Sequence, residues 1–291
     1  MSQAPIISPE ELKIRIENKQ TPALLDASFF LPGSDGNIYK GFESEHIPGA
    51  QIFDIDKICE PEAELAHTMP CDKIFAESLS KLGIKPDDEV VIYGQSGLVM
   101  GPARAWWMFK YFGHDNVKVL DGGLPAWKAI QGGITSGLPA ASKPQNTSYI
   151  CPETSCTALK SRSDVLAALN KSDSLIVDAR PAERFCGLSP EPRPGMRAGH
   201  IPGSINLPAG NFINPATGRL KSDSELKEIC APVLTALDKG KTIISSCGSG
   251  ITACVLALCI YKLTGKIICI YGGSWADWGR ESAGTPIAVN T

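Results

Sequence analysis

The chain has 291 residues, of which 43% are hydrophobic and 20% are charged, and its formal net charge at pH 7 is −3. This length predicts two domains of about 140 residues each, and the composition is that of a globular protein with ample core. The small negative charge gives no general attraction to nucleic acid or to an anionic membrane, so we expect neither as a partner.

The ten cysteines contain no Cys-x-x-Cys pair and no zinc-type spacing, so they predict no metal site. Residues 1–22 mix charges with apolar side chains and lack the apolar centre of a signal peptide. The most apolar run, residues 251–263, is too short and too interrupted to span a bilayer. Cysteines in a chain of this kind are expected to be reduced thiols, which predicts a cytoplasmic protein.

Strand and helix patterns alternate along the first half of the chain. Residues 10–18 have a helical pattern, and residues 23–27 predict a buried strand that ends in an acid and leads into a loop rich in Gly and Pro. The later patterns predict, in order, a helix, a strand, a helix, a strand and a helix that begins at Trp127; the first four cover residues 75–82, 89–93, 104–112 and 117–120.

The second half repeats this order about 150 residues later, which indicates an internal duplication. The matched segments are 24–27 with 175–179, 46–50 with 200–204, 89–93 with 242–246, and 121–124 with 272–275. Strands that alternate with helices predict an α/β fold in which each half is a mainly parallel sheet flanked by helices on both faces. We expect domains at residues 1–136 and 158–291, joined by a linker at 137–157.

Cys247 lies between a predicted strand, residues 242–246, and the apolar helical run 251–263. Glycines at 248 and 250 allow successive backbone amides to turn toward one point, and a helix N-terminus favours a thiolate there. These features favour a nucleophile at Cys247, although a buried structural cysteine is the alternative. The matching position in the first half is Gly94, so we expect the chemistry in the second half.

Several polar residues could serve this cysteine. Arg184 and Arg193 lie on a Pro-rich loop that could aim two guanidinium groups at one anion, or they could simply be solvated. Ser249 could donate to a substrate or cap the helix. His67 is the candidate acid or base, because His46 and His200 head a duplicated His-Ile-Pro-Gly turn and are expected to be structural. A role for His67 implies a cleft to which both halves contribute.

Taken together, the motifs resemble those of the tandem-rhodanese sulfurtransferases over nearly the whole chain. The resemblance is carried by the two His-Ile-Pro-Gly turns, by Asp178-Ala179-Arg180, by Pro190-Glu191-Pro192-Arg193 and by Ser274-Trp275-x-x-Trp278. Within this family, Cys247-Gly248-Ser249-Gly250-Ile251-Thr252 is similar to the loop of 3-mercaptopyruvate sulfurtransferases. Thiosulfate-type members usually have a basic pair after the cysteine, where this chain has Gly248 and Ser249.

The resemblance implies two rhodanese-like domains and a sulfur transfer in two half-reactions. Cys247 would carry the sulfur of 3-mercaptopyruvate as a persulfide, pyruvate would be released, and a small thiol, a protein dithiol such as thioredoxin, or cyanide would accept the sulfur. Arg184 and Arg193 would bind the donor together with the loop residues Gly248, Gly250, Ile251 and Thr252. Ser249, His67 and Asp56 would form a proton relay, and neither a metal nor an organic cofactor would be needed.

One departure from the family pattern and three alternatives stand beside this interpretation. Gly272 occupies a position where the family usually has Asp. A thiosulfate sulfurtransferase on the same scaffold is the first alternative. A cysteine phosphatase is the second, but the position at which its loop would carry an arginine is Ala253. A non-catalytic sulfur carrier or interaction module is the third.

Overall fold

The structure is a computed structural model that describes residues 4–31, 34–138, 148–152 and 156–289. It divides into two compact units. Unit 1 comprises Met1–Glu62, Met69–Cys156 and Asn214–Leu220, and unit 2 comprises Ala63–Thr68, Thr157–Ile213 and Lys221–Thr291. Each unit therefore includes a short segment from the other half of the sequence. Much of the expected linker, residues 137–157, lies outside the described residues.

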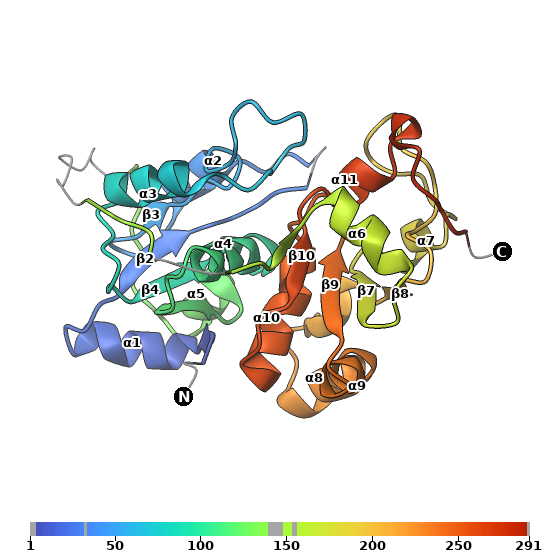
Figure 1. Ribbon diagram of the computed structural model, residues 1–291. Helices are drawn as coiled ribbons and strands as arrows, with labels where there is room; N and C mark the ends of the chain where they lie inside the picture. The colour runs from blue at the N-terminus through green and yellow to red at the C-terminus, as the bar shows by residue number, and fades with distance from the viewer. Residues whose placement is uncertain (1–3, 32–33, 139–147, 153–155, 290–291) are drawn as a thin grey trace. The chain divides into compact units, whose positions relative to one another are not determined.

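The sheet of unit 1 has five parallel strands in the order β1-β5-β4-β2-β3 (Figure 1). The strands are β1 (Ile6–Ile7), β2 (Ala23–Asp26), β3 (Gln51–Ile52), β4 (Val90–Tyr93) and β5 (Val117–Leu120). The helices between and after them are α1 (Pro9–Glu17), α2 (Ile38–Ser44), α3 (Asp72–Lys81), α4 (Met100–Tyr111) and α5 (Gly123–Ala129).

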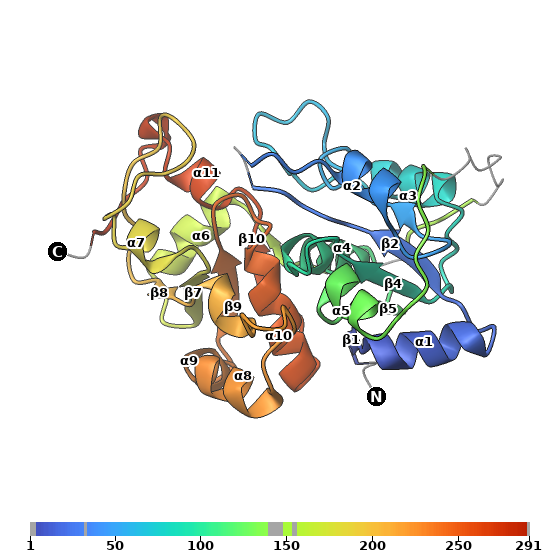
Figure 2. The same cartoon turned by 180° about the vertical axis from the view of Figure 1, so that it is seen from behind.

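Helices cover both faces of this sheet, and the alternating side chains of its strands fill the two layers of core. On one face, Val91 and Tyr93 of β4 pack in a buried cluster with Leu12 of α1 and Trp127 of α5. On the other, Phe75 of α3 belongs to an aromatic cluster with side chains of α4 and of the loop after β3. Both views place α1 and α3 on opposite sides of β2 and β4 (Figures 1 and 2).

Unit 2 repeats this sheet, with five parallel strands in the order β6-β10-β9-β7-β8. The strands are β6 (Leu159–Lys160), β7 (Ser174–Asp178), β8 (Ile205–Asn206), β9 (Thr242–Ser246) and β10 (Cys269–Tyr271). The α-helices are α6 (Arg162–Leu169), α7 (Ala182–Phe185), α8 (Asp223–Ile229), α9 (Ala231–Asp238), α10 (Ala253–Thr264) and α11 (Ser274–Trp278). Two 3-10 turns, η1 (Ala209–Phe212) and η2 (Glu281–Ala283), complete the unit.

The central strand β9 is covered on both sides. Val165 of α6 and Trp275 and Trp278 of α11 form one layer of core with Ile244 of β9. Helix α10 is buried from Ala253 to Tyr261, which is why that part is almost entirely apolar, and both views place it across β9 from α6 (Figures 1 and 2). The predicted fold class, two mainly parallel sheets flanked by helices, is therefore confirmed. None of the described helices is long and apolar enough to cross a membrane.

Three local predictions differ from the structure. The loop rich in Gly and Pro after β2 contains α2, which begins after the capping side chain of Asn37. Helix α5 begins at Gly123, so Trp127 lies near its end rather than at its start. The helix after Cys247 begins at Ala253 rather than at residue 251, because the N–H groups of Cys254 and Val255 make tight i→i−3 bonds to the carbonyl oxygens of Ile251 and Thr252. The loop that follows Cys247 is therefore longer than predicted.

The two His-Ile-Pro-Gly turns have the same construction in both units. The ring of His46 stacks on Phe42 at 3.8 Å, and its Nδ1 lies 2.7 Å from the carbonyl oxygen of Phe42. The ring of His200 stacks on Phe185 at 3.8 Å, and its Nδ1 lies 2.9 Å from that carbonyl oxygen. Both imidazoles are buried and bonded to the chain, which supports the structural role predicted for them.

Replacing His46 tests that role. The substitution His46→Ala removes the stack on Phe42 and leaves the Phe42 carbonyl without this partner, so the free energy of unfolding of unit 1 should fall by about 2 kcal/mol. Urea denaturation measures the loss. The control Lys40→Ala, on the exposed side of α2, should change it by less than about 0.5 kcal/mol. A His46→Ala protein as stable as the control would contradict a structural role.

Candidate active site

Cys247 follows the last residue of β9, at the carboxyl edge of the sheet of unit 2. Strands β7 and β10 pair with β9 on its two sides, so Cys247 lies at the middle of that edge. The residue is only 1% exposed. In parallel α/β sheets this edge is where loops gather to bind ligands, as the sequence predicts for Cys247.

The carbonyl groups at the start of the loop are held by α11. The N–H groups of Trp275 and Ala276 donate to the carbonyl oxygens of Cys247 and Gly248, each at 2.9 Å. The N–H of Cys247 itself donates to Oγ of Ser274 at 3.1 Å. Ser274 has a left-handed backbone (φ +49°), which is uncommon for a residue other than glycine. The loop is thus fixed through its carbonyl groups.

The amide groups of the same loop are left for a ligand. The N–H groups of Gly248, Ser249, Ile251 and Thr252 donate to no acceptor among the residues that the structure describes. Ile251 is 1% exposed, and buried amides without a partner are rare in proteins. A Cβ at Gly250 would lie 2.9 Å from the carbonyl oxygen of Gly272, so only glycine fits there. The loop 247–252 is a nest suited to an anion.

Two guanidinium groups flank this nest at Gly248. A Cβ built on Gly248 would lie 3.5 Å from Nη2 of Arg184 and 3.8 Å from Nη1 of Arg193. The structure therefore brings both predicted arginines to the loop that follows Cys247. The basic groups near the nest come from a distant part of the sequence.

Glu191 holds one of these arginines in place. Its buried carboxylate forms ion pairs with Arg184 and with Arg180, the latter at 2.7 Å. Arg180 is itself buried, pairs with Asp178 at 2.6 Å and stacks over the ring of Trp275 at 4.1 Å. Sequence analysis did not identify Glu191 as part of the site. Its position between two arginines in the Pro-rich loop was the available signal.

Among the three arginines near the nest, Arg180, Arg184 and Arg193, only Arg193 has no acidic side chain to balance its charge within the described residues. Arg180 and Arg184 are matched in number by Asp178 and Glu191, which pair with them. Arg193 makes no hydrogen bond or ion pair within the described part of the chain. It also lines a cavity of about 570 Å³ in unit 2, together with residues 64–66, 194–196, Ala276 and 280–282. One net positive charge suits a ligand with a single negative charge.

His67 reaches the nest from a segment that belongs to unit 2 although its sequence lies in the first half. Its Nδ1 lies 3.1 Å from Oγ of Ser249. The backbone of His67 is left-handed (φ +63°), a conformation that is strained for this residue and recurs at functional sites. The structure therefore joins two members of the predicted relay.

Asp56, the third predicted member of the relay, belongs to unit 1. Asp56 is exposed. Its N–H donates to Oδ1 of Asp54 at 3.0 Å, and its carbonyl oxygen accepts from Sγ of Cys59 at 3.0 Å. Its part in a relay stays a prediction. Within the described residues, no group of three or more His, Cys, Asp or Glu side chains is arranged to hold a metal ion.

Two other thiols of the chain are held in the neutral form by burial. Burial raises the pKa of Cys230 to about 12 and the pKa of Cys151 to about 11, because a thiolate in either place would lose its hydration. Both side chains are therefore protonated at neutral pH and are poor nucleophiles.

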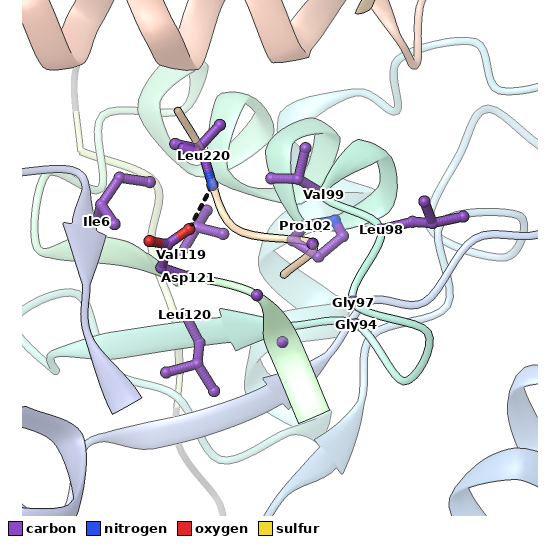
Figure 3. A pocket seen from close by; sticks show the side chains of 13 residues that line it. Ile6, Gly94, Gly97, Leu98, Val99, Pro102, Val119, Leu120, Asp121 and Leu220 are labelled. Atoms are coloured by element: carbon purple, nitrogen blue, oxygen red, sulfur yellow. Dashed lines mark hydrogen bonds between the residues drawn. The ribbon is translucent and has the colours of Figure 1, made fainter. Parts of the chain in front are cut away.

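The equivalent place in unit 1 has no such chemistry. Gly94 follows β4, and the N–H of Leu124 donates to its carbonyl oxygen at 2.9 Å, as that of Trp275 does to Cys247. The residues around Gly94 line a cavity of only about 10 Å³, to which Leu220 contributes (Figure 3). That volume is about what one water molecule needs. Among its described residues, unit 1 therefore has neither a thiol nor a substrate-sized cavity at the place that matches Cys247.

Comparison with known proteins agrees with this architecture. Residues 8–130 and 161–281 each match the rhodanese-like domain. The chain is 37% identical to 3-mercaptopyruvate sulfurtransferase from Rattus norvegicus, over 88% of this chain and 84% of that protein. It is 35% identical to thiosulfate/3-mercaptopyruvate sulfurtransferase 1, mitochondrial, from Arabidopsis thaliana, over 95% of this chain and 76% of that protein.

A solved structure with the same fold matches nearly the whole chain. The sub-stoichiometric sulfur transferase subunit of yeast mitochondrial complex I is 32% identical and superposes with a TM-score of 0.86, covering 98% of this chain and 99% of that one. Two matched domains and relatives of this identity establish the family. The chain belongs to the tandem rhodanese-domain sulfurtransferases, the family that includes the 3-mercaptopyruvate sulfurtransferases.

Proposed function

We propose that this protein transfers the sulfur of 3-mercaptopyruvate through a persulfide on Cys247 to a thiol acceptor and releases pyruvate. The observation that carries the proposal is the buried Cys247 at the start of a nest of unpaired amides, with Arg184 and Arg193 beside Gly248. The name of the rat relative supports the choice of donor.

In the first half-reaction the thiolate of Cys247 attacks the sulfur of 3-mercaptopyruvate. A sulfur–sulfur bond forms, the carbon–sulfur bond breaks, and its electron pair leaves with the carbon as the enolate of pyruvate. One proton then converts the enolate to pyruvate. The outer sulfur of the persulfide lies in the nest, where the amides of residues 248–252 stabilise its negative charge.

The two arginines have different parts in binding the donor. Arg193 has all its donors available among the described residues, so it takes the carboxylate of the donor as a charge-assisted pair. Arg184 uses Nε and Nη2 on Glu191 and keeps Nη1 for the keto oxygen, where charge develops as the enolate forms.

Ser249 and His67 supply the proton. The hydroxyl of Ser249 hydrogen-bonds the imidazole of His67, which can pass a proton as a general acid or base. Asp56 would orient the imidazole. Neither step requires a metal or an organic cofactor.

In the second half-reaction an acceptor thiolate attacks the outer sulfur, takes it as a new persulfide and releases Cys247 as a thiolate. A small thiol, a protein dithiol such as thioredoxin, or cyanide meets this chemical requirement, and the order is ping-pong. A cytoplasmic location, drawn from the cysteines and apolar pattern of the sequence, is part of the same proposal.

The use of thiosulfate is the second candidate function, since the name of the Arabidopsis relative includes both donors. Thiosulfate is a dianion, whereas the carboxylate of 3-mercaptopyruvate provides one charge. The single uncompensated charge of Arg193 favours the monoanion.

Donor choice is tested by adding charge to the nest. The double variant Gly248→Arg/Ser249→Lys should raise the ratio of kcat/KM for thiosulfate to that for 3-mercaptopyruvate by about tenfold or more, because each added cation favours the dianion. A side chain at Gly248 meets the neighbouring arginines at ordinary contact distance. The neutral control Gly248→Gln/Ser249→Met has similar bulk and should not shift the ratio this way. Equal ratios in the two variants would show that charge does not set donor choice.

Proton transfer and donor binding are separated by a second set of variants. His67→Ala should lower kcat on the order of 10- to 1000-fold with a smaller change in KM, because it removes a group that acts during the reaction. Arg193→Ala and Arg184→Ala should mainly raise KM for 3-mercaptopyruvate, since their bonds already exist in the bound ground state. Arg193→Lys keeps the charge and should recover part of the loss. Unaltered turnover in His67→Ala would rule out the relay.

A further inference from the structure

His67 lies in a short segment of unit 2 that has a counterpart in unit 1. The two segments differ in the side chains that bond them to the rest of their units. Segment 63–68 of unit 2 comes from the connection between β3 and α3. Segment 214–220 of unit 1 comes from the connection between β8 and α8, which is the same connection of the second repeat. The two segments therefore hold corresponding places in their units, and their anchors can be compared.

The segment in unit 1 is firmly anchored. Oδ1 of Asp121 accepts the N–H of Leu220 at 2.8 Å, the bond drawn as a dashed line in Figure 3. Within the segment, the N–H of Asn214 donates to the carbonyl oxygen of Arg219 at 2.8 Å, and Arg219 forms an ion pair with Glu10 at 3.2 Å. The carboxylate of Asp121 thus fixes the segment through its backbone.

Unit 2 has no carboxylate at that place, because the residue equivalent to Asp121 is Gly272. The N–H of Asp121 donates to Ile7 across β5 and β1, and the N–H of Gly272 donates to Lys160 across β10 and β6 in the same register. Three residues later, Leu124 and Trp275 make equivalent bonds to Gly94 and Cys247. A glycine cannot tether a neighbouring segment with its side chain.

The segment that carries His67 has few other anchors. The N–H groups of residues 63–66 and 68 donate to no acceptor in the described part of the chain. The segment also has an internal bond from Oγ1 of Thr68 to the carbonyl oxygen of Leu65. Toward the rest of unit 2, His67 contacts Ser249 and Glu64 forms an ion pair with Arg280. The left-handed backbone of His67 needs support from outside the segment.

We infer that Arg280 is a positioning residue: its ion pair with Glu64 takes the place of the missing carboxylate and holds His67 against Ser249. Arg280 is itself well fixed, since its Nε donates to the carbonyl of Ala276 at 3.0 Å and its backbone bridges to Met196. The Glu64 side chain is 81% exposed. An exposed pair holds weakly and is screened by salt, so His67 is placed by a contact that ionic strength weakens.

This inference rests on the proposed sulfur transfer, and its test has one readout that does not. In Arg280→Gln and in Glu64→Gln, kcat should fall about three- to fivefold with KM nearly unchanged, and the double variant should lose no more than either alone. Cleavage by thermolysin at Leu65, located by mass spectrometry, should become faster in all three, because a loosened segment fits a protease more readily. Arg280→Lys should restore most of both. About 0.5 M salt should lower kcat of the unaltered protein but not of the variants.

Lys262→Gln is the matched control, because Lys262 and Asp223 form an ion pair of similar exposure elsewhere in unit 2. It should change neither kcat nor the rate of cleavage at Leu65. An unchanged cleavage rate in Arg280→Gln would overturn the inference whatever the activity. Faster cleavage in a chain that releases no pyruvate from 3-mercaptopyruvate would leave the tether standing and reject the proposed function instead.

Restoring the carboxylate tests the comparison of the two units directly. Gly272→Asp in the Arg280→Gln background should recover at least half of the lost protection and turnover. The added Cβ would lie 3.0 Å from Cδ1 of Leu159, the flexible end of a side chain that has to shift by a few tenths of an ångström. If the doubly altered chain is cleaved at Leu65 as fast as Arg280→Gln alone, the proposed equivalence of the two tethers is wrong.

Discussion

The arrangement of the site depends on how α11 holds the loop after β9. The N–H groups of Trp275 and Ala276 donate to the carbonyl oxygens of Cys247 and Gly248, and the hydroxyl oxygen of Ser274 accepts the N–H of Cys247. The N–H groups of Gly248, Ser249, Ile251 and Thr252 have no acceptor within the described residues. The bonds to α11 fix the nest through the protein itself, so stabilising charge in it costs little rearrangement.

Charge decides what such a nest accepts. The amides provide partial positive charges, but the full charges come from a separate loop, where Glu191 binds Arg180 and Arg184 and leaves Arg193 uncompensated. A second acid near this group would cancel the remaining charge, and a second free base would favour dianions. Under the proposed function, the residues around the cysteine thus set which donor it serves on this fold.

Sequence predicted the parts of this protein that depend on local pattern. The parallel strands, the internal repeat, and the position of Cys247 after β9 all follow from apolar periodicity and glycine placement. Helix α2 was missed because its short sequence is surrounded by Gly and Pro, and its start depends on the cap at Asn37. The start of α10 two residues late reflects a tight first turn at Ile251 and Thr252, which the apolar pattern does not reveal.

Contacts between distant segments could not be read from the pattern in the same way. The family resemblance pointed to Arg184, Arg193, Ser249 and His67, but Glu191 and Ser274 act through partners that only the folded chain brings near. The sequence shows Gly272 at a position where the family usually has Asp. What this glycine changes becomes clear only from the bond between Leu220 N–H and the carboxylate of Asp121 in unit 1. Long-range pairing is set by the packing of elements and not by local sequence.

The central claim is that Cys247 carries the transferred sulfur, and mass spectrometry tests it most directly. After incubation with 3-mercaptopyruvate and no acceptor, the intact chain should gain the mass of one sulfur atom, located by peptide mapping on Cys247 and lost again when a thiol is added. Cys247→Ser should gain none, although its nine remaining cysteines are unchanged. Sulfur found on another cysteine, or an equal gain in Cys247→Ser, would contradict the account.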